Sequence, residues 1–404
     1  MESIRERPLR VAIATESFLP TTNGVTTSVC RVLDYLRANG HEAIVITPSA
    51  GLGTAGTQTR YAGYRVYELP AVAYRQFPVG LPSQQAQKIL ADFAPDVLHA
   101  ASPFILGGQA IDAAERLGIP SVAVFQTDLA GYAARNHLTA ATRIAWRIVR
   151  RIHLKAGLTL VPSTSSMADL ESVGIERLER WGRGVDLERY HPNNRLRPET
   201  EALRARLAPN GETLVGYIGR MAPEKQVERF AALRGIPNVR FVMVGDGPSV
   251  PSVTRALAGM PVSWLGRLDG DDLSTAWSAL DLFVHTGDEE TFGQTVQEAQ
   301  ASGVAVVAPR AGGPIDLIEH GVNGMLFTPG DAADLRGIVA GLVADPALRL
   351  RIGEAGRRSV LGKSWASVCE TLLSYYHRAI GDLQIAAPGT RSHAARRTRT
   401  AKVS

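Results

Sequence analysis

The sequence predicts an α/β protein with two Rossmann-like domains that face each other across a cleft. A chain of 404 residues is too long for one ordinary core and fits two domains of roughly 150–200 residues. Apolar strand-like runs alternate with helix-like stretches, and the series occurs twice. Between the two series lies "WGRGVDLERYHPNNRLRPE" (181–199), whose Pro, Asn and charged residues are typical of a linker.

The first series opens with "LRVAIAT" (9–15), followed by an amphipathic stretch from Gly24 to Asn39. Its later strands are expected at "EAIVITP", "RVYEL", "DVLHA", "SVAVFQ" and "LTLVPS". The second series has "LVGYIGR", "VRFVMVGDG", "VSWLG", "DLFVHT", "VAVVAP" and "GMLFTP". Sheets of this kind bind ligands at the carboxyl ends of their strands.

These patterns predict five divisions of the chain. They are an N-terminal Rossmann-like domain (1–182), a linker (183–199), a C-terminal Rossmann-like domain (200–363), a last helix (364–383) and a disordered tail (384–404). The last helix packs on the second domain or crosses back to the first. The tail is polar and aperiodic, and is either a solvated end or a weak anchor to anionic lipid.

Composition narrows the possible locations of the protein. The formal charge of +5 is matched by five basic residues, with no acid, from Leu383 onward, so the body of the protein is near neutral. No apolar window is long enough to span a membrane, and "VAIA" near the start is too short for a signal-peptide core. Cys30 and Cys369 are expected to be unbridged and buried. A cytoplasmic protein is expected.

Two loops carry groups suited to phosphate. Asn23-Gly24 opens a helix, where free backbone N–H groups suit a phosphate, although a simple turn with Asn23 as N-cap explains it equally well. Arg220 and Lys225 follow a strand directly and could clamp a diphosphate. The alternative is a solvated loop in which Glu224 neutralises one of them.

A third loop, "DEETFGQTVQEA" (288–299), has two glutamates eight residues apart. Glu290 precedes a helix expected to begin near Phe292, and Glu298 lies within it. The first N–H groups of that helix, at Phe292, Gly293 and Gln294, should be unsatisfied and able to bind sugar hydroxyls or phosphate oxygens. Glu290 could accept hydrogen bonds from a sugar and Glu298 from both hydroxyls of a ribose, or Glu298 is an ordinary helix residue.

No metal site is expected. Asp269 and Asp271 form a D-x-D pattern, but they sit in a polar turn where Asp272 is expected to act as a helix N-cap. The sequence lacks C-x-x-C and Cys/His clusters, and it also lacks G-x-G-x-x-G, which disfavours a dehydrogenase.

Taken together, "GR(x)4K" at 219–225 and E-x7-E in "EETFGQTVQE" resemble retaining glycosyltransferase family 4, of GT-B fold, over essentially all of residues 9–380. The "NGV" turn, "VPS" at 161–163, "GVD" at 184–186, "VGDG" and "ASGVAVVAPRAGGPIDLI" add to the resemblance. It implies an enzyme whose N-terminal domain binds the acceptor and whose C-terminal domain binds the sugar-nucleotide donor.

The resemblance also implies roles for individual residues. Arg220 and Lys225 would stabilise the diphosphate leaving group, and Gly24 would meet the phosphates through its backbone. Glu290, with the backbone of Phe292 and Gly293, would hold the transferred sugar, and Glu298 would hold the ribose. The base would lie at Arg267 and Leu268. Such an enzyme needs neither a protein nucleophile nor a metal, because side-chain cations stabilise the leaving group.

Within the family, "VAIATESFLPTTNGVTTSV", "VFQTDLAGYA" and "RWGRGVD" look most like GDP-mannose-dependent α-mannosyltransferases of bacterial mannolipid synthesis. This implies GDP-mannose as donor and a glycolipid acceptor, such as glucuronosyl diacylglycerol or a phosphatidylinositol mannoside. The family usually has His where Gln126 stands, so Gln126 can hydrogen-bond a sugar hydroxyl but excludes imidazole chemistry there. Asp128 follows two residues later.

A basic helix is expected within residues 142–157. Arg143, Arg147, Arg150 and Arg151 fall at i, i+4, i+7 and i+8 and so share one face. They form either a solvated face on a core-packed helix or a surface that holds anionic lipid at the inner face of the plasma membrane.

Two rival functions are kept. One is a UDP-sugar-dependent GT-B enzyme of a soluble pathway, which a panel of donors would distinguish. The other is a sugar-nucleotide-binding module without enzymatic activity, which slow hydrolysis of the donor would exclude.

Overall fold

The computed structural model describes residues 7–21, 23–49, 59–74, 77–80, 84–126 and 139–386. The chain divides into two compact units. The first comprises Met1–Leu160, Glu171–Glu179 and Cys369–Ser404, and the second comprises Val161–Leu170 and Arg180–Val368. Asp128 and most of the basic tail (387–404) lie outside the described residues.

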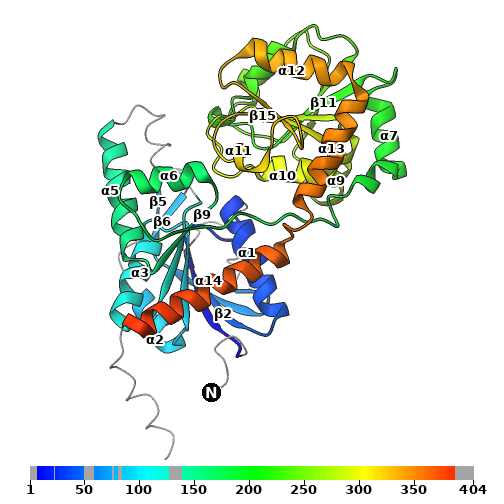
Figure 1. The fold of residues 1–404 in the computed structure, drawn as a ribbon. Coiled ribbons are helices and arrows are strands. Elements are labelled where there is room, and N and C mark those ends of the chain that lie inside the picture. Colours follow the sequence, from blue (N-terminus) through cyan, green and yellow to red (C-terminus); the bar gives the residue numbers. More distant parts are fainter. Residues whose placement is uncertain are drawn as a thin grey trace, which may run out of the picture. The chain divides into compact units, whose positions relative to one another are not determined.

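The first unit is built on an eight-stranded sheet in the order β10-β9-β8-β7-β1-β2-β4-β3 (Figure 1). Its strands are β1 (Arg10–Thr15), β2 (Glu42–Pro48), β3 (Arg60–Tyr61), β4 (Tyr64–Leu69), β7 (Val97–Ala101), β8 (Ser121–Val124), β9 (Leu158–Val161) and β10 (Leu178–Arg180). Strand β1 pairs in parallel with β2 and β7, and Ala12 stands opposite Ile44 and Leu98. A short hairpin, β5 (Ala71–Tyr74) with β6 (Phe77–Gly80), is separate.

Helices accompany this sheet as the alternating pattern predicts. They are α1 (Gly24–Ala38), α2 (Gln85–Phe93), α3 (Ile105–Leu117), α5 (Thr139–Lys155) and most of α14 (Trp365–Ala386). Helix α6 (Thr164–Ser172) falls mainly in the second unit. Residues on the strands and on α2, α3 and α5 share one apolar cluster, which includes Ala12, Leu98, Leu90, Ile111 and Ile152. The first sheet is therefore covered by helices whose apolar stripes face it.

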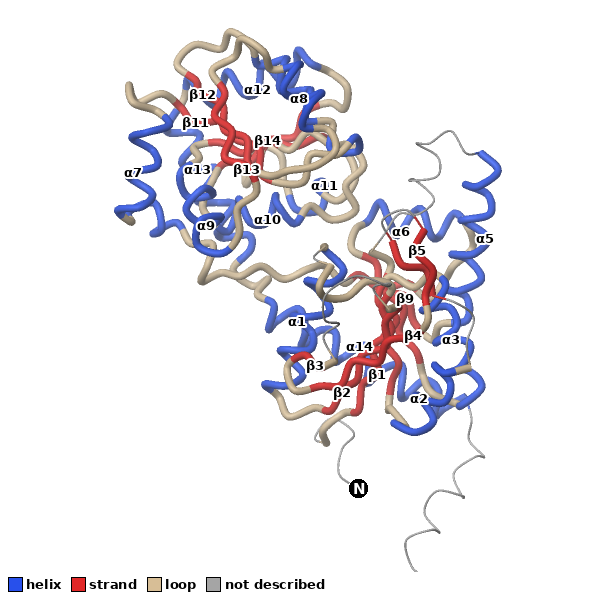
Figure 2. The backbone as a smooth tube through the Cα atoms, turned by 180° about the vertical axis from the view of Figure 1, so that it is seen from behind, coloured by secondary structure: helices blue, strands red, loops and turns tan. Residues whose placement is uncertain are grey.

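The second unit has a six-stranded parallel sheet in the order β13-β12-β11-β14-β15-β16 (Figure 2). Its strands are β11 (Thr213–Ile218), β12 (Val239–Val244), β13 (Val262–Gly266), β14 (Leu282–Val284), β15 (Ala305–Pro309) and β16 (Met325–Phe327). Its helices are α7 (Pro198–Leu207), α8 (Val250–Ala256), α9 (Gly270–Ala279), α10 (Gln294–Ala301), α11 (Pro314–Leu317), α12 (Ala332–Ala344) and α13 (Pro346–Val360), with 3-10 turns at Pro192–Leu196, Pro223–Lys225 and Val227–Leu233.

Both faces of this second sheet are buried. Leu214 and Ile218 of β11 point into one apolar cluster with α9 and α10, whereas Val215 and Tyr217 point into a second cluster with α12. This alternation explains why the strand reads as a continuous apolar run. The strand order reverses between β11 and β14, which is where a doubly wound sheet opens a crevice for ligands.

The segment expected as a linker is packed within the second unit. Val185 N donates to Lys363 O (2.9 Å), and the Asn194 amide donates to Arg189 O (2.7 Å) and Ser274 Oγ (3.0 Å). The last helix, α14, belongs to the first unit from Cys369 onward. Within that unit, the Tyr376 hydroxyl lies 2.7 Å from Nδ1 of the buried His99. Of the two fates left open for this helix, the structure places most of it with the first unit.

Both cysteines are unbridged; Cys369 is buried, and Cys30 is half-buried rather than buried as expected. Among the described residues we find no helix with the length and apolar character that a membrane crossing requires.

Candidate active site

Three loops at the carboxyl edge of the second sheet come together next to the switch point. The first follows β11 and carries Arg220 and Lys225, and the second follows β14 and carries Glu290. Their contact is close, because a Cβ on Gly287 would lie 2.6 Å from Glu224 O and 3.0 Å from Lys225 Cα. The third loop follows β15, and its Gly313 N–H donates a hydrogen bond to Glu290 O at 2.6 Å. Two glycines thus allow three loops to converge.

A charged pair occupies the centre of this cluster. Lys225 Nζ lies 2.5 Å from Glu290 Oε2, and the Glu290 side chain is 15% exposed. The buried His285 approaches the same carboxylate oxygen to 4.0 Å. Burial alone would raise the pKa of Glu290, but the charge of Lys225, that of His285 where it is protonated in acid, and the hydrogen bonds that Glu290 accepts lower it to about 2. Glu290 is therefore a carboxylate at neutral pH.

His285 is neutral under the same conditions. Burial lowers its pKa to about 4, although the carboxylate of Glu290 acts in the opposite direction. Sequence reasoning did not single out this residue, whose signal was its position directly after the strand before "DEETFG". At 4.0 Å its Nε2 is beyond hydrogen-bond distance of Glu290, so the neutral ring leaves the close contact with the carboxylate to Lys225.

The two cations predicted to share a role have different surroundings. Arg220 is largely exposed (63%) and pairs with Glu224 on the same loop, while Lys225 is mostly buried. The alternative in which Glu224 neutralises one cation of the loop thus applies to Arg220. Tyr217 donates a hydrogen bond to Arg220 O (2.8 Å) and fixes the backbone between strand and loop.

A second ion pair holds the beginning of the loop that carries Glu290. Arg229 makes a bidentate contact with Asp288, at 2.6 and 2.7 Å, and donates to Thr286 O at 2.9 Å. Fork-to-fork pairs of this kind fix geometry as well as charge. Neither residue was identified as a candidate from sequence.

Helix α10 begins later than expected. Its first residue is Gln294 and its N-cap is Gly293, whose φ of 98° favours glycine. The expectation that the Phe292 N–H is free is wrong, because it donates to Glu290 Oε1 at 3.3 Å. The Phe292 side chain is buried in the core.

Glu298 lies one helix turn beyond Gln294, and its environment differs from that of Glu290. Burial raises its pKa to about 7, and the neighbouring Gln294 amide, Trp277 indole and Arg183 guanidinium reduce that rise. The two glutamates of the E-x7-E pattern are thus both at the site, but only Glu290 has a close ion pair.

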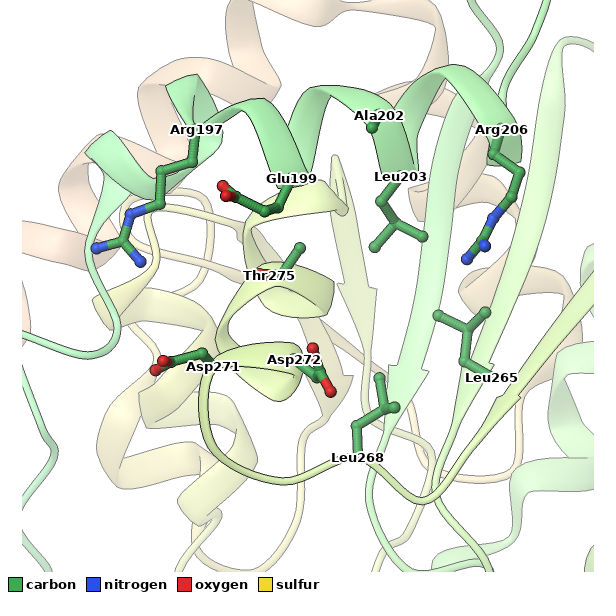
Figure 3. Close-up of a pocket in the computed structure, with 10 residues that line it drawn as sticks. All are labelled: Arg197, Glu199, Ala202, Leu203, Arg206, Leu265, Leu268, Asp271, Asp272 and Thr275. Atoms are coloured by element: carbon green, nitrogen blue, oxygen red, sulfur yellow. The ribbon is translucent and has the colours of Figure 1, made fainter.

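A cavity in the second unit is lined by none of these charged residues (Figure 3). It measures about 880 Å³ and lies between α7, β13 and the start of α9; its lining includes Leu203, Leu265, Leu268 and Asp272. Leu268, predicted to lie near the base, lines this cavity with its side chain. Arg267 is exposed and lies 3.4 Å from Asp269. The expected N-cap at Asp272 is wrong, since α9 begins at Gly270 and its cap position is Asp269.

The remaining candidates lie in the first unit. Gly24 is the first residue of α1, and the Asn23 side chain accepts from Val25 N (2.9 Å) and Thr26 N (3.0 Å), so the N-cap alternative describes this turn. Gln126 is buried just beyond β8. Among the described residues, no group of three or more His, Cys, Asp or Glu side chains is placed to hold a metal.

Comparison with known proteins identifies the family. The protein-family model described as Glycosyltransferase Family 4 matches residues 22–189. The family model described as Glycosyl transferases group 1 matches residues 199–359. A GDP-mannose-dependent alpha-mannosyltransferase of Mycolicibacterium smegmatis is 44% identical over 92% of this chain and 98% of its own. An alpha-monoglucosyldiacylglycerol synthase of Acholeplasma laidlawii is 26% identical over 79% of this chain and 85% of its own.

Solved structures agree on the fold. A sucrose-phosphate synthase from Thermosynechococcus elongatus has a TM-score of 0.75 at 19% identity, covering 93% of this chain and all of that one. With two parallel-sheet Rossmann-like units and both family models matched in order, the chain belongs to glycosyltransferase family 4 and is a glycosyltransferase of GT-B fold.

Proposed function

We propose that this enzyme transfers mannose, with retention of configuration, from GDP-mannose to a membrane glycolipid of the glucuronosyl diacylglycerol or phosphatidylinositol mannoside type. The donor follows the name of the 44% identical relative. The observation that carries the chemistry is the Lys225–Glu290 pair, which joins the loops after β11 and β14 at the switch point.

In this proposal the two members of the Lys225–Glu290 pair act on opposite sides of the bond that breaks. Cleavage of the anomeric C–O bond puts positive charge on the sugar and negative charge on the diphosphate. Lys225, assisted by Arg220, stabilises the diphosphate, while Glu290 accepts hydrogen bonds from the sugar. Both groups are already charged and held in place, so little reorganisation is needed during the reaction.

The remaining contacts complete the donor site. Glu298 holds the ribose, and the backbone at Gly293 and Gln294 holds sugar or phosphate oxygens. Arg267 and Leu268 contact the nucleotide base. Gly24 and Gln126 also bind the donor. The acceptor hydroxyl attacks on the face that the diphosphate leaves, and the departing phosphate takes its proton. The side-chain cations make a metal unnecessary, so activity should persist in EDTA.

The lipid acceptor is supported by helix α5 and by the relative named alpha-monoglucosyldiacylglycerol synthase. Arg143, Arg147, Arg150 and Arg151 are all exposed, while Val149 and Ile152 of the same helix are buried. Ile144, between the arginines, is 55% exposed. Arg151 lies 4.0 Å from Asp112, and Arg150 donates to Val173 O (2.8 Å), which leaves Arg143 and Arg147 as the main lipid contacts in the proposal.

Incubation with labelled GDP-mannose and membrane extract tests the proposal, with identification of the labelled lipid. Mannose should appear in a glycolipid, and UDP-glucose should label it poorly. Label from UDP-glucose alone would refute the mannosyl assignment, and label only in water-soluble products would refute the lipid acceptor.

The role of α5 has its own test. Changing Arg143, Arg147, Arg150 and Arg151 to Gln should abolish sedimentation with anionic liposomes at low salt, because each basic residue near such a surface contributes about 1 kcal/mol. Hydrolysis of GDP-mannose in solution should remain nearly unchanged. A variant that binds liposomes as well as the parent would exclude this helix as the membrane contact.

A further inference from the structure

Thr286 lies in the loop that follows β14, between the end of the strand and Glu290. It is 0% exposed, and its hydroxyl donates a hydrogen bond to Lys225 O at 2.7 Å. Further along the same loop, Glu290 contacts the other end of Lys225, with Oε2 2.5 Å from Nζ. One loop therefore contacts Lys225 twice, at its backbone carbonyl and at its ammonium group.

Lys225 stands where the backbone changes conformation. It ends the short 3-10 turn Pro223–Lys225, and the next residue, Gln226, is left-handed with a φ of 48°. Such a conformation is uncommon for residues other than glycine and persists only where the surroundings impose it. The hydrogen bond from Thr286 is a restraint of this kind, because it comes from a buried side chain on another loop.

Arg229 fixes Thr286 in turn. Its guanidinium donates to Thr286 O at 2.9 Å and makes the bidentate contact with Asp288. Arg229 belongs to the 3-10 turn Val227–Leu233, whose apolar side chains are buried in the core. Thr286 is therefore held through its carbonyl by a packed turn, which gives its hydroxyl a defined direction toward Lys225.

The contact depends on a hydroxyl and not only on a small side chain. A valine at position 286 would fill nearly the same volume but would leave the Lys225 carbonyl without this donor, and the backbone of Lys225 would lose that restraint. The ammonium group would move with the backbone. A displacement of a positioned group by about 1 Å can lower a rate by about 100-fold.

We infer that Thr286 is a positioning residue for Lys225, whose backbone it holds so that the ammonium group meets the donor diphosphate while paired with Glu290. This rests on the proposed function, in which Lys225 stabilises the diphosphate leaving group. Thr286 acts through Lys225 and needs no contact with the donor. Arg229 completes the arrangement, because it fixes the backbone of Thr286.

The test compares Thr286→Val, which removes the hydroxyl, with Thr286→Ser, which keeps it. With labelled GDP-mannose and membrane extract, the rate of transfer at saturating donor should fall about 10- to 100-fold in Thr286→Val. The affinity for GDP, measured by calorimetry, should change by less than about threefold, because the charge of Lys225 matters most in the transition state. Thr286→Ser should stay within about threefold of the parent in both quantities, since it retains the donor.

Two controls separate positioning from loss of stability. Thr213→Val removes another buried threonine hydroxyl, at the first residue of β11 and so at the opposite end of that strand from the Lys225 loop, and should keep the parental rate. In a Lys225→Ala background, Thr286→Val should cause no additional loss of rate, since the group that it positions is gone. A Thr286→Val protein with a lowered Tm but the parental rate, or a loss that persists in the Lys225→Ala background, would overturn the inference.

Arg229→Gln is a second variant that keeps the Thr286 hydroxyl and removes the group that fixes it. The rate should fall about three- to tenfold with GDP affinity nearly unchanged, because the restraint on Lys225 is loosened indirectly. If Thr286→Val does not fold, this variant decides. A folded Arg229→Gln protein with the parental rate would then overturn the inference.

The proposed function and this inference fail in different ways. If the parent uses UDP-glucose and not GDP-mannose, the mannosyl donor is refuted, and the same variants are compared with UDP-glucose and UDP. Normal turnover in Lys225→Ala would refute the role of Lys225 in the proposed function, and the inference with it. A rate that falls in Lys225→Ala but not in folded Thr286→Val would refute the Thr286 inference alone.

Discussion

Glu290 and Glu298 are eight residues apart at one short helix, and their surroundings shift their pKa values in opposite directions. Glu290 lies in the loop before α10, 2.5 Å from Lys225, with a pKa lowered to about 2. Glu298 lies within α10, where burial raises its pKa to about 7. The same side chain is thus a fixed anion in one place and a titrating group in the other, because a close cation outweighs burial only for Glu290.

The difference suggests a division of labour. A fixed charge paired with Lys225 suits the part of the donor where charge develops, since its effect is greatest in the transition state. Glu298 has no such close cation, and the proposal places it at the ribose, whose contacts change little during the reaction. Four predictions test this division, from the largest expected effect to the smallest.

Removal of Lys225 should have the largest effect. Lys225→Ala leaves the diphosphate without its buried cation and Glu290 without its partner, so kcat should fall by about 10²–10³, as for loss of one preorganised charge-stabilising group. Donor binding should weaken far less. Steady-state kinetics with GDP-mannose would check this, and normal turnover with only a raised KM would mean that Lys225 merely binds.

The pH dependence of stability should have opposite signs for the two acids. The pKa of Glu290 is lowered from 4.5 to about 2, so its contribution of roughly 3 kcal/mol is present above pH 4.5 and is lost as pH falls toward 2. The pKa of Glu298 is raised from 4.5 to about 7, so its favourable contribution is complete below pH 4.5 and is lost as pH rises through 7.

Matched isosteric variants can measure these signs. Between pH 5 and 8, Glu290→Gln should lower Tm by a nearly constant amount. Over the same range Glu298→Gln should become steadily more stable relative to the parent as pH rises. Scanning calorimetry at several pH values would check both, and a pair of variants with parallel profiles would contradict the difference between the two carboxyls.

Truncation of Glu298 should affect binding rather than turnover. For Glu298→Ala we expect about tenfold weaker donor binding and a kcat close to that of the parent at saturating GDP-mannose, because ribose contacts change little during the reaction. Binding by calorimetry and turnover by product release separate the two quantities. A collapse of kcat at saturation would place Glu298 in the chemical step.

The smallest effect concerns donor selection in the parent enzyme. GDP-mannose should raise Tm by a few degrees more than UDP-glucose at equal concentration, because binding to the folded state stabilises it by mass action. In Glu290→Gln the advantage of GDP-mannose over GDP should shrink, since GDP lacks the sugar that Glu290 holds. Equal or reversed shifts in the parent would refute the mannosyl donor while leaving the fold intact.

The sequence determined the architecture and the chemical groups of the site. Repeated apolar runs predicted two doubly wound sheets, because strands buried on both faces must be apolar along their length. Arg220, Lys225 and Glu290 could be placed after particular strands, because loops that follow parallel strands share one edge of the sheet. These features depend on local pattern and strand order, which a single chain displays directly.

Tertiary structure alone decided which groups pair and in what state of charge. Lys225 and Glu290 are 65 residues apart, His285 faces the same carboxylate, and Thr286 donates to the backbone of Lys225. The start of α10 also escaped prediction, because Glu290 accepts the Phe292 N–H and Gly293 takes a left-handed conformation. Pairing and pKa depend on distances and burial, which arise only when segments remote in sequence pack together.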